Sequence, residues 1–307
     1  MKNPTLDPED WDVFRQQAHA MLDRAIDQMR DSGKGRVWTP AAKSLRDQLR
    51  SGLPETPLAL SEVVNRLTAL LPHGVGNTHP RFLAWVHGAG TPGNILAEMT
   101  AAAMNANLGG RDHAAIHVER QVLGWCRDLM GFPEGAGGLI TSGTSAATVV
   151  ALKVARDWAA GWETRAAGVT SARSLVGYAS CEAHNCVARA FDLLGLGTDA
   201  LRRVPANSER RMDTQALRRT IDEDRASGLR PFLLVGTAGT VNTGAIDDLT
   251  RLADIAEGEA LWLHVDGAFG ASLMLSESLR GRVAGLERAQ SLAFDFHKWM
   301  QVNYAAG

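Results

Sequence analysis

One lysine of this sequence, Lys298, directly follows a short apolar run. The run SLAFDF, residues 291–296, is typical of a buried strand, and the functional residues of α/β proteins gather beyond the carboxyl ends of such strands. A lysine amine can attack a carbonyl group to form a Schiff base when a dry pocket or a neighbouring cation lowers its pKa. Lys298 is therefore our candidate for covalent chemistry.

Asp266 ends a second apolar run, LWLHVD. A carboxylate at the end of a buried strand needs a partner, because burying it unpaired is strongly unfavourable. A protonated pyridine nitrogen would be such a partner. A capping or metal-binding role explains Asp266 equally well when this residue is considered alone.

Small and hydroxyl-bearing residues, TSGTSAAT, precede a predicted helix over 145–161. Gly143, Thr144 and Ser145 would lie at its N-terminus, where unsatisfied backbone N–H groups carry partial positive charge. Small residues let a phosphate group approach these N–H groups, and the hydroxyls add donors. An ordinary capped helix start is the alternative interpretation. The G-K-[ST] ending of a nucleotide-triphosphate loop does not occur here.

His184 follows the predicted strand 175–180 in the stretch SCEAHNC. The two cysteines beside it suggest zinc, but C-x-x-H-x-C matches no closed tetrahedral pattern and lacks a fourth ligand. We therefore expect no metal site. A histidine at a strand-to-helix turn can instead stack flat on a planar ring.

Together these residues supply the parts that one cofactor requires. Pyridoxal phosphate needs a lysine for a Schiff base, an aspartate for its protonated ring nitrogen and a helix N-terminus for its phosphate. Along the chain the order is phosphate turn, His184, Asp266 and Lys298, each at the end of a predicted strand or the start of a predicted helix. We therefore predict a pyridoxal phosphate site.

A G-x-G-x-x-G pattern at Gly88, Gly90 and Gly93 suggests a different ligand, a dinucleotide. That interpretation requires an acidic residue at the end of a second strand about 20 residues further on. Asp112 stands near this distance, but the surrounding NANLGGRDH is not a strand. We interpret the pattern as a glycine-rich turn.

Four apolar runs bounded by turn residues predict the strands that position these groups, at 175–180, 231–239, 261–269 and 291–296. Helical patterns lie between them, at 184–195, 213–227 and 247–257, and this alternation predicts a mostly parallel sheet covered on both faces. Residues 1–75 read as an N-terminal helical arm, and residues 76–307 as the cofactor-binding large domain. Short helices bury little alone, so we expect the arm to form a homodimer contact.

Composition narrows the class of protein further. A net charge of −2 over 307 residues gives no reason to expect nucleic acid or an anionic membrane as a partner. The longest apolar runs fall short of the roughly 18 residues of a spanning helix, and the polar N-terminus does not resemble a signal peptide. The three cysteines form no staple pattern, so we expect a reducing cytoplasm.

The site residues lie in stretches that resemble the pyridoxal-phosphate-dependent group II amino-acid decarboxylases, which include the aromatic-L-amino-acid decarboxylases. These stretches are HPRFLAW, LITSGTSAAT, ASCEAHNCVARA, GTAGTVNTGAID, LHVDGAFG and FDFHKWM. The resemblance runs from about residue 11 to the last residue, and His-Lys-Trp with the upstream HVD is its specific part. It implies the large domain of an α/β, fold-type-I pyridoxal-phosphate-dependent transferase. Because family members run further, it also implies that a small C-terminal domain is missing from this sequence.

The resemblance assigns a role to each matching position. Lys298 would hold the cofactor as a Schiff base, Asp266 would pair with the ring nitrogen, and His184 would stack on the ring. The other implied residues are Thr240 and Ala268 along the ring; Gly143, Thr144, Ser145 and Asp295 at the phosphate; His297 at the phosphate or the substrate carboxylate; and Trp85, Val86, His87 and Gly88 around the substrate. The glycine-rich turn thereby becomes the rim of the substrate pocket.

The implied reaction is decarboxylation of an L-amino acid, aromatic or related, to its amine and carbon dioxide. An aldehyde-forming decarboxylase or an aminotransferase-like protein of the same fold shares the lysine, the aspartate and the phosphate turn, so these alternatives stay open. A truncated chain that binds the cofactor without turnover stays open too, because the sequence stops soon after Lys298. The phosphate turn also departs from the usual S-E-A, reading Ser145-Ala146-Ala147.

Overall fold

A computed structural model describes residues 7–53, 55–107, 109, 112–172 and 174–307. The described chain forms two compact units. The first comprises the described residues up to Ala84 together with Thr91–Ile95, and the second comprises Trp85–Gly90 and Leu96–Gly307. The division falls later than the predicted boundary after residue 75, and the segment 85–90 belongs with the second unit.

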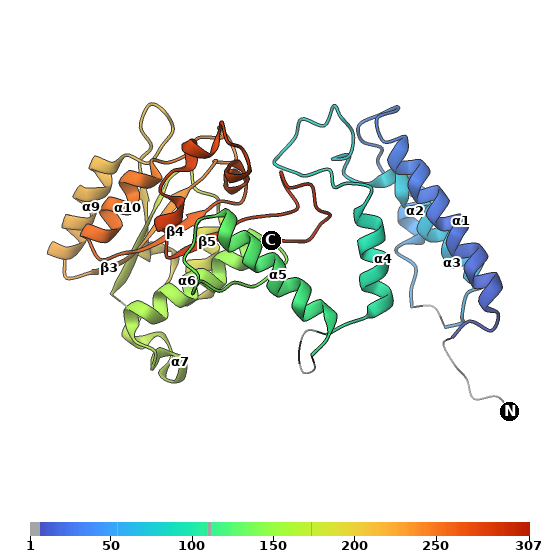
Figure 1. The fold of residues 1–307 in the computed structure, drawn as a ribbon, viewed down its shortest axis with the longest axis horizontal. Coiled ribbons are helices and arrows are strands. Elements are labelled where there is room, and N and C mark those ends of the chain that lie inside the picture. Colours follow the sequence, from blue (N-terminus) through green and yellow to red (C-terminus); the bar gives the residue numbers. More distant parts are fainter. Residues whose placement is uncertain (1–6, 54, 108, 110–111, 173) are drawn as a thin grey trace. The chain divides into compact units, whose positions relative to one another are not determined.

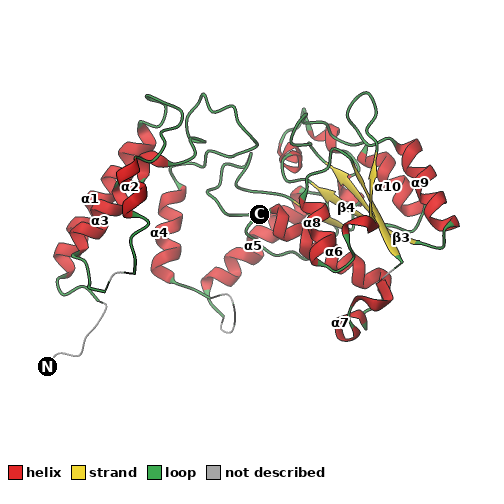
Figure 2. Ribbon diagram, turned by 180° about the vertical axis from the view of Figure 1, so that it is seen from behind, coloured by secondary structure: helices red, strands yellow, loops and turns green. Residues whose placement is uncertain are grey.

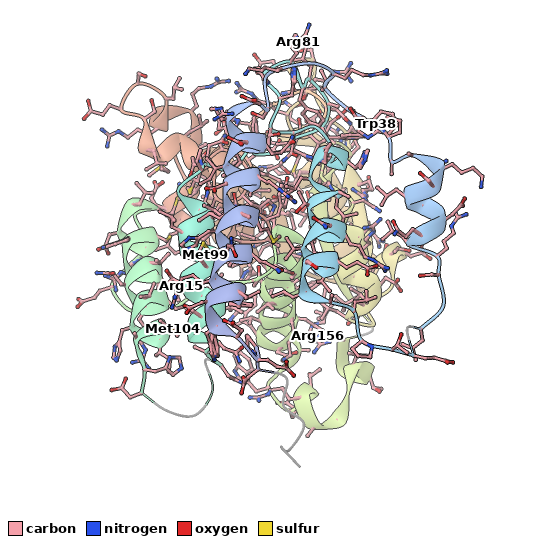
Figure 3. The ribbon with its side chains drawn as sticks, turned by 90° about the vertical axis from the view of Figure 1, so that its right-hand side faces the viewer. Arg15, Trp38, Arg81, Met99, Met104 and Arg156 are labelled. Carbon is pink, nitrogen blue, oxygen red and sulfur yellow. The ribbon has the colours of Figure 1, made fainter. Side chains whose placement is uncertain are left out.

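Helices dominate the first unit (Figure 1). These are α1 (Trp11–Arg30), α2 (Lys43–Gln48), α3 (Leu60–Thr68) and the 3₁₀ turn η1 (Leu71–His73). The Asp10 carboxylate caps α1 by accepting hydrogen bonds from the N–H groups of Asp12 and Val13 at 2.8 and 3.0 Å. Arg24 of α1 donates to Asn65 of α3 at 3.3 Å. Every residue of α1 and α3 keeps part of its surface exposed, and Figure 3 labels Arg15 on the exposed surface of α1.

A five-stranded parallel sheet forms the centre of the second unit, in the order β2-β1-β3-β4-β5. Its strands are β1 (Leu175–Ser180), β2 (Leu201–Val204), β3 (Arg230–Thr237), β4 (Trp262–Asp266) and β5 (Ser291–Ala293). All four predicted strands exist, but β4 and β5 each end three residues earlier than predicted. The strand β2 was not predicted.

Helices cover both faces of this sheet (Figure 2). One face packs against α6 (Thr144–Ala160) and α8 (Cys186–Leu193), with Leu233 and Val235 of β3 in the shared core. The other face packs against α9 (Thr214–Ala226) and α10 (Leu249–Gly258), with Leu234 of β3 in that core. The alternation follows from the strand period of two, which sends successive side chains to opposite faces.

The remaining helices of the second unit lie before and after α6. They are α4 (Asn94–Met104), which begins in the first unit, α5 (Ala114–Leu129) and the short α7 (Thr164–Ala167). Met99 and Met104 of α4 are exposed (Figure 3). Among the described residues, none of the helices is both long enough and apolar enough to span a bilayer.

A buried ion-pair cluster fixes α6 to the end of α8. Arg156, labelled in Figure 3, donates to the Asp157 carboxylate at 2.7 Å and to the Leu194 carbonyl oxygen at 2.9 Å. Lys153 pairs with the other Asp157 oxygen at 2.5 Å. Because Asp157 is fully buried, removing either cation would leave a desolvated charge only partly compensated. This cluster holds the two helices whose N-terminal ends reach the candidate site.

The chain beyond β5 returns to the start of α6. Gly307 donates its N–H to the Thr141 carbonyl at 3.1 Å, and the Thr141 N–H donates to the Gly307 carbonyl at 2.6 Å. Residues 294–307 therefore form a loop beside the N-terminus of α6, and Lys298 lies on this loop.

Candidate active site

A pocket of about 420 Å³ lies at the carboxyl ends of β1, β3, β4 and β5, where the parallel-sheet rule places ligands. Its lining residues all belong to the second unit. They are Trp85, Val86, His87, Ser142, Gly143, Thr144, Ser145, Ala146, His184, Thr237, Gly239, Thr240, Val241, Asp266, Ala268, Phe269, Asp295, His297, Lys298 and Tyr304. The pocket thus brings together the predicted lysine, aspartate, histidines and phosphate turn, which stand far apart in the sequence.

Lys298 is held by an ion pair inside this pocket. Its Nζ lies 2.7 Å from Oδ2 of Asp295, which is buried. The other oxygen, Oδ1, accepts a hydrogen bond from the Thr144 N–H at 2.7 Å. Asp295 therefore does two things at once: it caps the N-terminus of α6 and balances the charge of the lysine.

The turn before α6 leaves polar groups available to a ligand. Gly143 has a φ of 145°, in the region that favours glycine, and a Cβ there would meet His297 and Asp295 at 3.2 and 3.4 Å. The hydroxyl of Thr144 is buried without a hydrogen-bond partner among the described residues, and the same holds for Thr237, which also lines the pocket. Buried hydroxyls are normally satisfied, so two unpaired ones on residues that line one pocket indicate a polar ligand.

Asp266 ends β4 with its carboxylate buried against α6 and α8. Oδ1 accepts a hydrogen bond from the Ala268 N–H at 3.1 Å, and Oδ2 lies 3.9 Å from the Cys186 thiol. Burial raises the pKa of the Asp266 carboxyl above its ordinary range, against the opposing effects of the Ala268 N–H and the Lys298 charge. A buried acid of this kind binds a proton, or a protonated group, strongly.

The two histidines nearest the lysine and the aspartate are fixed by backbone groups. His184 lines the pocket between β1 and α8, and its Nδ1 accepts a hydrogen bond from the Cys186 N–H at 3.2 Å. His297 is buried, with Nδ1 2.7 Å from the Ala306 carbonyl oxygen and its ring 4.2 Å from the ring of Tyr304. Its Nε2 lies 3.8 Å from Asp295.

The segment 85–90 packs against the loop that carries Lys298. Trp85, Val86 and His87 line the pocket, whereas Gly88 lies against the backbone: a Cβ there would come within 2.2 Å of the His297 carbonyl and 2.5 Å of the Lys298 carbonyl. The Ala89 N–H donates to the Gln301 side chain at 3.0 Å. The segment therefore supports the lysine loop as well as forming one wall of the pocket.

Several lining residues were missed by the sequence analysis, chiefly Thr237, Val241, Phe269 and Tyr304. Two of them carried a usable signal. Thr237 lies close to the end of the predicted strand 231–239, and Phe269 follows Asp266 by three residues in HVDGAF. Tyr304 lies six residues after Lys298, and only the return of residues 294–307 to the start of α6 brings its ring to the pocket.

Comparison with known proteins identifies the family. The pyridoxal-dependent decarboxylase conserved domain matches residues 42–307. The chain belongs to the pyridoxal-dependent decarboxylase family.

Individual relatives agree with this family assignment. The aromatic-L-amino-acid decarboxylase of Bacillus atrophaeus is 33% identical over 300 residues, covering 96% of this chain and 60% of that protein. The L-2,4-diaminobutyrate decarboxylase of Rhizobium meliloti is 31% identical over 299 residues, covering 96% and 58%. The decarboxylase domain from Vibrio parahaemolyticus superposes with a TM-score of 0.89 at 30% identity, covering 98% of this chain and 67% of that one.

These matches confirm the predicted family, the predicted α/β fold and the cofactor on which the family depends, pyridoxal phosphate. The chain spans about 60% of the length of the curated relatives that it matches. The role of each individual site residue stays a prediction.

The pocket residues fit this cofactor. The unpaired Thr144 hydroxyl at the start of α6 would donate a hydrogen bond to an anion. The buried Asp266 carboxylate would pair with a protonated ring nitrogen. Lys298 Nζ shares the same pocket and is charge-balanced rather than isolated. The hydroxyl, the carboxylate and the amine therefore match the phosphate, the protonated ring nitrogen and the carbonyl group of pyridoxal phosphate.

Proposed function

We propose that this protein decarboxylates an L-amino acid, aromatic or related, to the amine and carbon dioxide, with pyridoxal phosphate carried on Lys298. One observation carries the proposal. The Lys298 amine, the buried Asp266 carboxylate and the N-terminus of α6 all line the same pocket of about 420 Å³. These three groups would bind, respectively, the carbonyl, the ring nitrogen and the phosphate of one cofactor.

When bound, pyridoxal phosphate supplies an electron sink for the bond that breaks at the substrate Cα. The chain's own residues would hold and tune it. Asp266 would keep a proton on the ring nitrogen, because burial makes this carboxylate an avid proton partner. His184, Thr240 and Ala268 would flank the ring, since all three line the pocket beside Asp266.

The phosphate would bind at the start of α6, through the helix N-terminus and the Thr144 and Ser145 hydroxyls. Asp295 already occupies the Thr144 N–H and pairs with Lys298. We infer that Asp295 helps to orient this turn and that it releases Lys298 when the amine reacts. His297 would contact the phosphate or the substrate carboxylate, because its Nε2 lies 3.8 Å from the same Asp295 oxygen that accepts from the Thr144 N–H at the turn.

Aromatic side chains on the pocket wall support an aromatic substrate. Trp85, Phe269 and Tyr304 line the pocket together with Val86 and His87. Trp85 has a φ of 55°, an uncommon backbone conformation for a bulky residue, and 73% of its surface is exposed. Apolar rings of this kind favour a planar apolar substrate group over the ammonium of a diamino acid.

The N-terminal arm, residues 1–75, would form a homodimer contact. Trp11 and Phe14 of α1 and Val63 and Leu67 of α3 leave between 37% and 60% of their surfaces exposed. Covering such an apolar surface with a second copy is favourable because apolar area leaves water. A cytoplasmic location belongs to the same proposal: Cys126, Cys181 and Cys186 are free, as a reducing compartment would keep them.

The proposal is tested by product analysis. The full chain, loaded with pyridoxal phosphate, is incubated separately with L-tryptophan, L-tyrosine, L-phenylalanine, L-2,4-diaminobutyrate and L-glutamate, and released carbon dioxide is measured beside amine and aldehyde. We expect equal amounts of carbon dioxide and amine from at least one aromatic amino acid. Aldehyde with carbon dioxide would favour the aldehyde-forming alternative. Cofactor binding without carbon dioxide from any of the five would contradict the proposed activity.

A further inference from the structure

Three buried side chains form a row that begins at Asp266 and continues with Cys186 and Thr148, neither of which lines the pocket. Thr148 of α6 lies 3.9 Å from the sulfur of Cys186, the first residue of α8, and this sulfur lies 3.9 Å from Oδ2 of Asp266. Their exposed fractions are 0%, 3% and 4%. Both distances fit hydrogen bonds to sulfur, whose larger radius lengthens the contact.

The direction of hydrogen bonding along this row is set by charge. When it is ionised, as it must be to pair with a protonated ring nitrogen, the Asp266 carboxylate can only accept, so the thiol hydrogen then points at Oδ2 and the Thr148 hydroxyl is left to donate to the sulfur. Burial, together with the nearby negative charge of Asp266, raises the pKa of the Cys186 thiol to about 12. The thiol therefore stays neutral at physiological pH and keeps its hydrogen.

Cys186 also contacts the second residue predicted to bind the cofactor ring. Its N–H donates to Nδ1 of His184 at 3.2 Å, while its side chain contacts Asp266. One residue thus orients the imidazole through its backbone and the carboxylate through its sulfur. The bond from Arg156 to the Leu194 carbonyl oxygen joins the same two helices, α6 and α8, that carry Thr148 and Cys186.

A thiol in this position differs chemically from a hydroxyl. Among the described residues each Asp266 oxygen has one donor: the Ala268 N–H at Oδ1 and the thiol at Oδ2. A thiol is a weak donor, so it orients the carboxylate while withdrawing little of its negative charge. A hydroxyl would make a shorter and stronger bond to the same oxygen and would leave the carboxylate less basic.

We propose that Cys186, supported by Thr148, is a positioning residue that orients the Asp266 carboxylate and preserves its hold on the proton of the cofactor's ring nitrogen. The effect on the cofactor rests on the proposed function, but the contact between thiol and carboxylate does not. The two are therefore tested separately.

The contact is tested without cofactor by Raman spectroscopy of the S–H stretch. The spectrum of the full chain minus that of Cys186→Ala isolates this thiol, and the same subtraction is made in an Asp266→Ala background. We expect the Cys186 band to move toward the position of a free thiol when Asp266 is removed. An unchanged band in the two backgrounds would overturn the proposal.

The consequence is tested on the full chain loaded with pyridoxal phosphate labelled with ¹⁵N in its ring. In Cys186→Ser, we expect the ring-nitrogen resonance to shift at fixed pH toward that of an unprotonated pyridine. Cys181→Ser, which alters an exposed cysteine, is the matched control and should leave the resonance in place. Identical resonances in the two variants would overturn the effect on the ring nitrogen. A wild-type chain that binds no labelled cofactor would contradict the proposed function, and the Raman result would still decide the contact.

Discussion

The Lys298 ammonium lies 2.7 Å from Oδ2 of Asp295, whose other oxygen accepts a hydrogen bond from the Thr144 N–H. The reactive amine and the start of α6 therefore share a single buried carboxylate. Asp295 accordingly restrains the lysine until the cofactor arrives.

Replacing Asp295 by Asn is expected to speed cofactor loading. The amide oxygen can still accept from the Thr144 N–H, but the charge that retains the Lys298 ammonium is gone. For a partly exposed ion pair we expect an increase of roughly two- to fivefold in the loading rate. Stopped-flow absorbance after mixing cofactor-free chain with pyridoxal phosphate measures it. Asp295→Ala, which also loses the helix cap, is the contrasting variant, and equal loading rates in Asp295→Asn and wild type would contradict the restraint.

Replacing Asp266 by Asn is expected to stabilise the cofactor-free chain at neutral pH. Because burial raises the pKa of Asp266, the folded state favours its protonated form, so stability is lost as pH rises above about 4, the ordinary Asp value. Asn avoids this loss, and its advantage should vanish as the pH falls toward that value. Thermal unfolding of both chains between pH 4 and 8 provides the test. If the stability advantage of Asp266→Asn over wild type instead grew toward low pH, the prediction would be contradicted.

Gly88 is expected to tolerate no side chain. A Cβ at this position would meet the carbonyl oxygens of His297 and Lys298 at 2.2 and 2.5 Å, so the backbone beside the lysine would have to move. Gly88→Ala should lower the free energy of unfolding by about 1–3 kcal/mol and weaken pyridoxal phosphate binding. Gly93→Ala, where a Cβ meets nothing within 4 Å, is the control. Urea unfolding and cofactor titration measure both effects, and two variants of equal stability would exclude this packing.

His264 is expected to make the protein acid-sensitive. It is fully buried, which lowers the pKa of its imidazole to about 4, and its Nε2 has no hydrogen-bond partner in the part of the chain that the structure describes. The folded state favours the neutral ring, so stability is present above about pH 6.5 and is lost as pH falls toward 4. Between pH 7 and pH 5 wild type should lose about 2 kcal/mol more than His264→Asn. Urea unfolding at both pH values measures the free energy of unfolding of the two proteins. Equal losses in wild type and His264→Asn would contradict a role of His264 in acid sensitivity.

The central strands were predictable because their burial is continuous. All of β1 is buried, and from Phe232 onward so is β3, and the matching apolar runs stand out between turn residues. The edge strand β2 was missed because LRRV buries only Leu201 and Val204, while its two arginines reach the surface. Alternation over four residues is too short to separate an edge strand from a loop.

The site was predictable to the extent that it lies at strand ends. Lys298 and Asp266 each follow an apolar run, and the chemistry of their side chains is distinctive. The contact between Cys186 and Asp266 joins positions 80 residues apart and depends on how α8 packs beside β4. The early end of β5 was equally hidden, because FDF continues the apolar pattern although the chain turns after Ala293 to bring Asp295 beneath α6.

The central claim is that Lys298 carries pyridoxal phosphate, and reductive trapping tests it most directly. The full chain is mixed with pyridoxal phosphate, reduced with sodium borohydride, digested and analysed by mass spectrometry, beside Lys298→Ala. We expect one phosphopyridoxyl group on the peptide that contains Lys298, with the visible absorbance of the bound cofactor lost in the variant. Modification spread over Lys153 and other lysines, or an equal absorbance in Lys298→Ala after dialysis, would contradict the account.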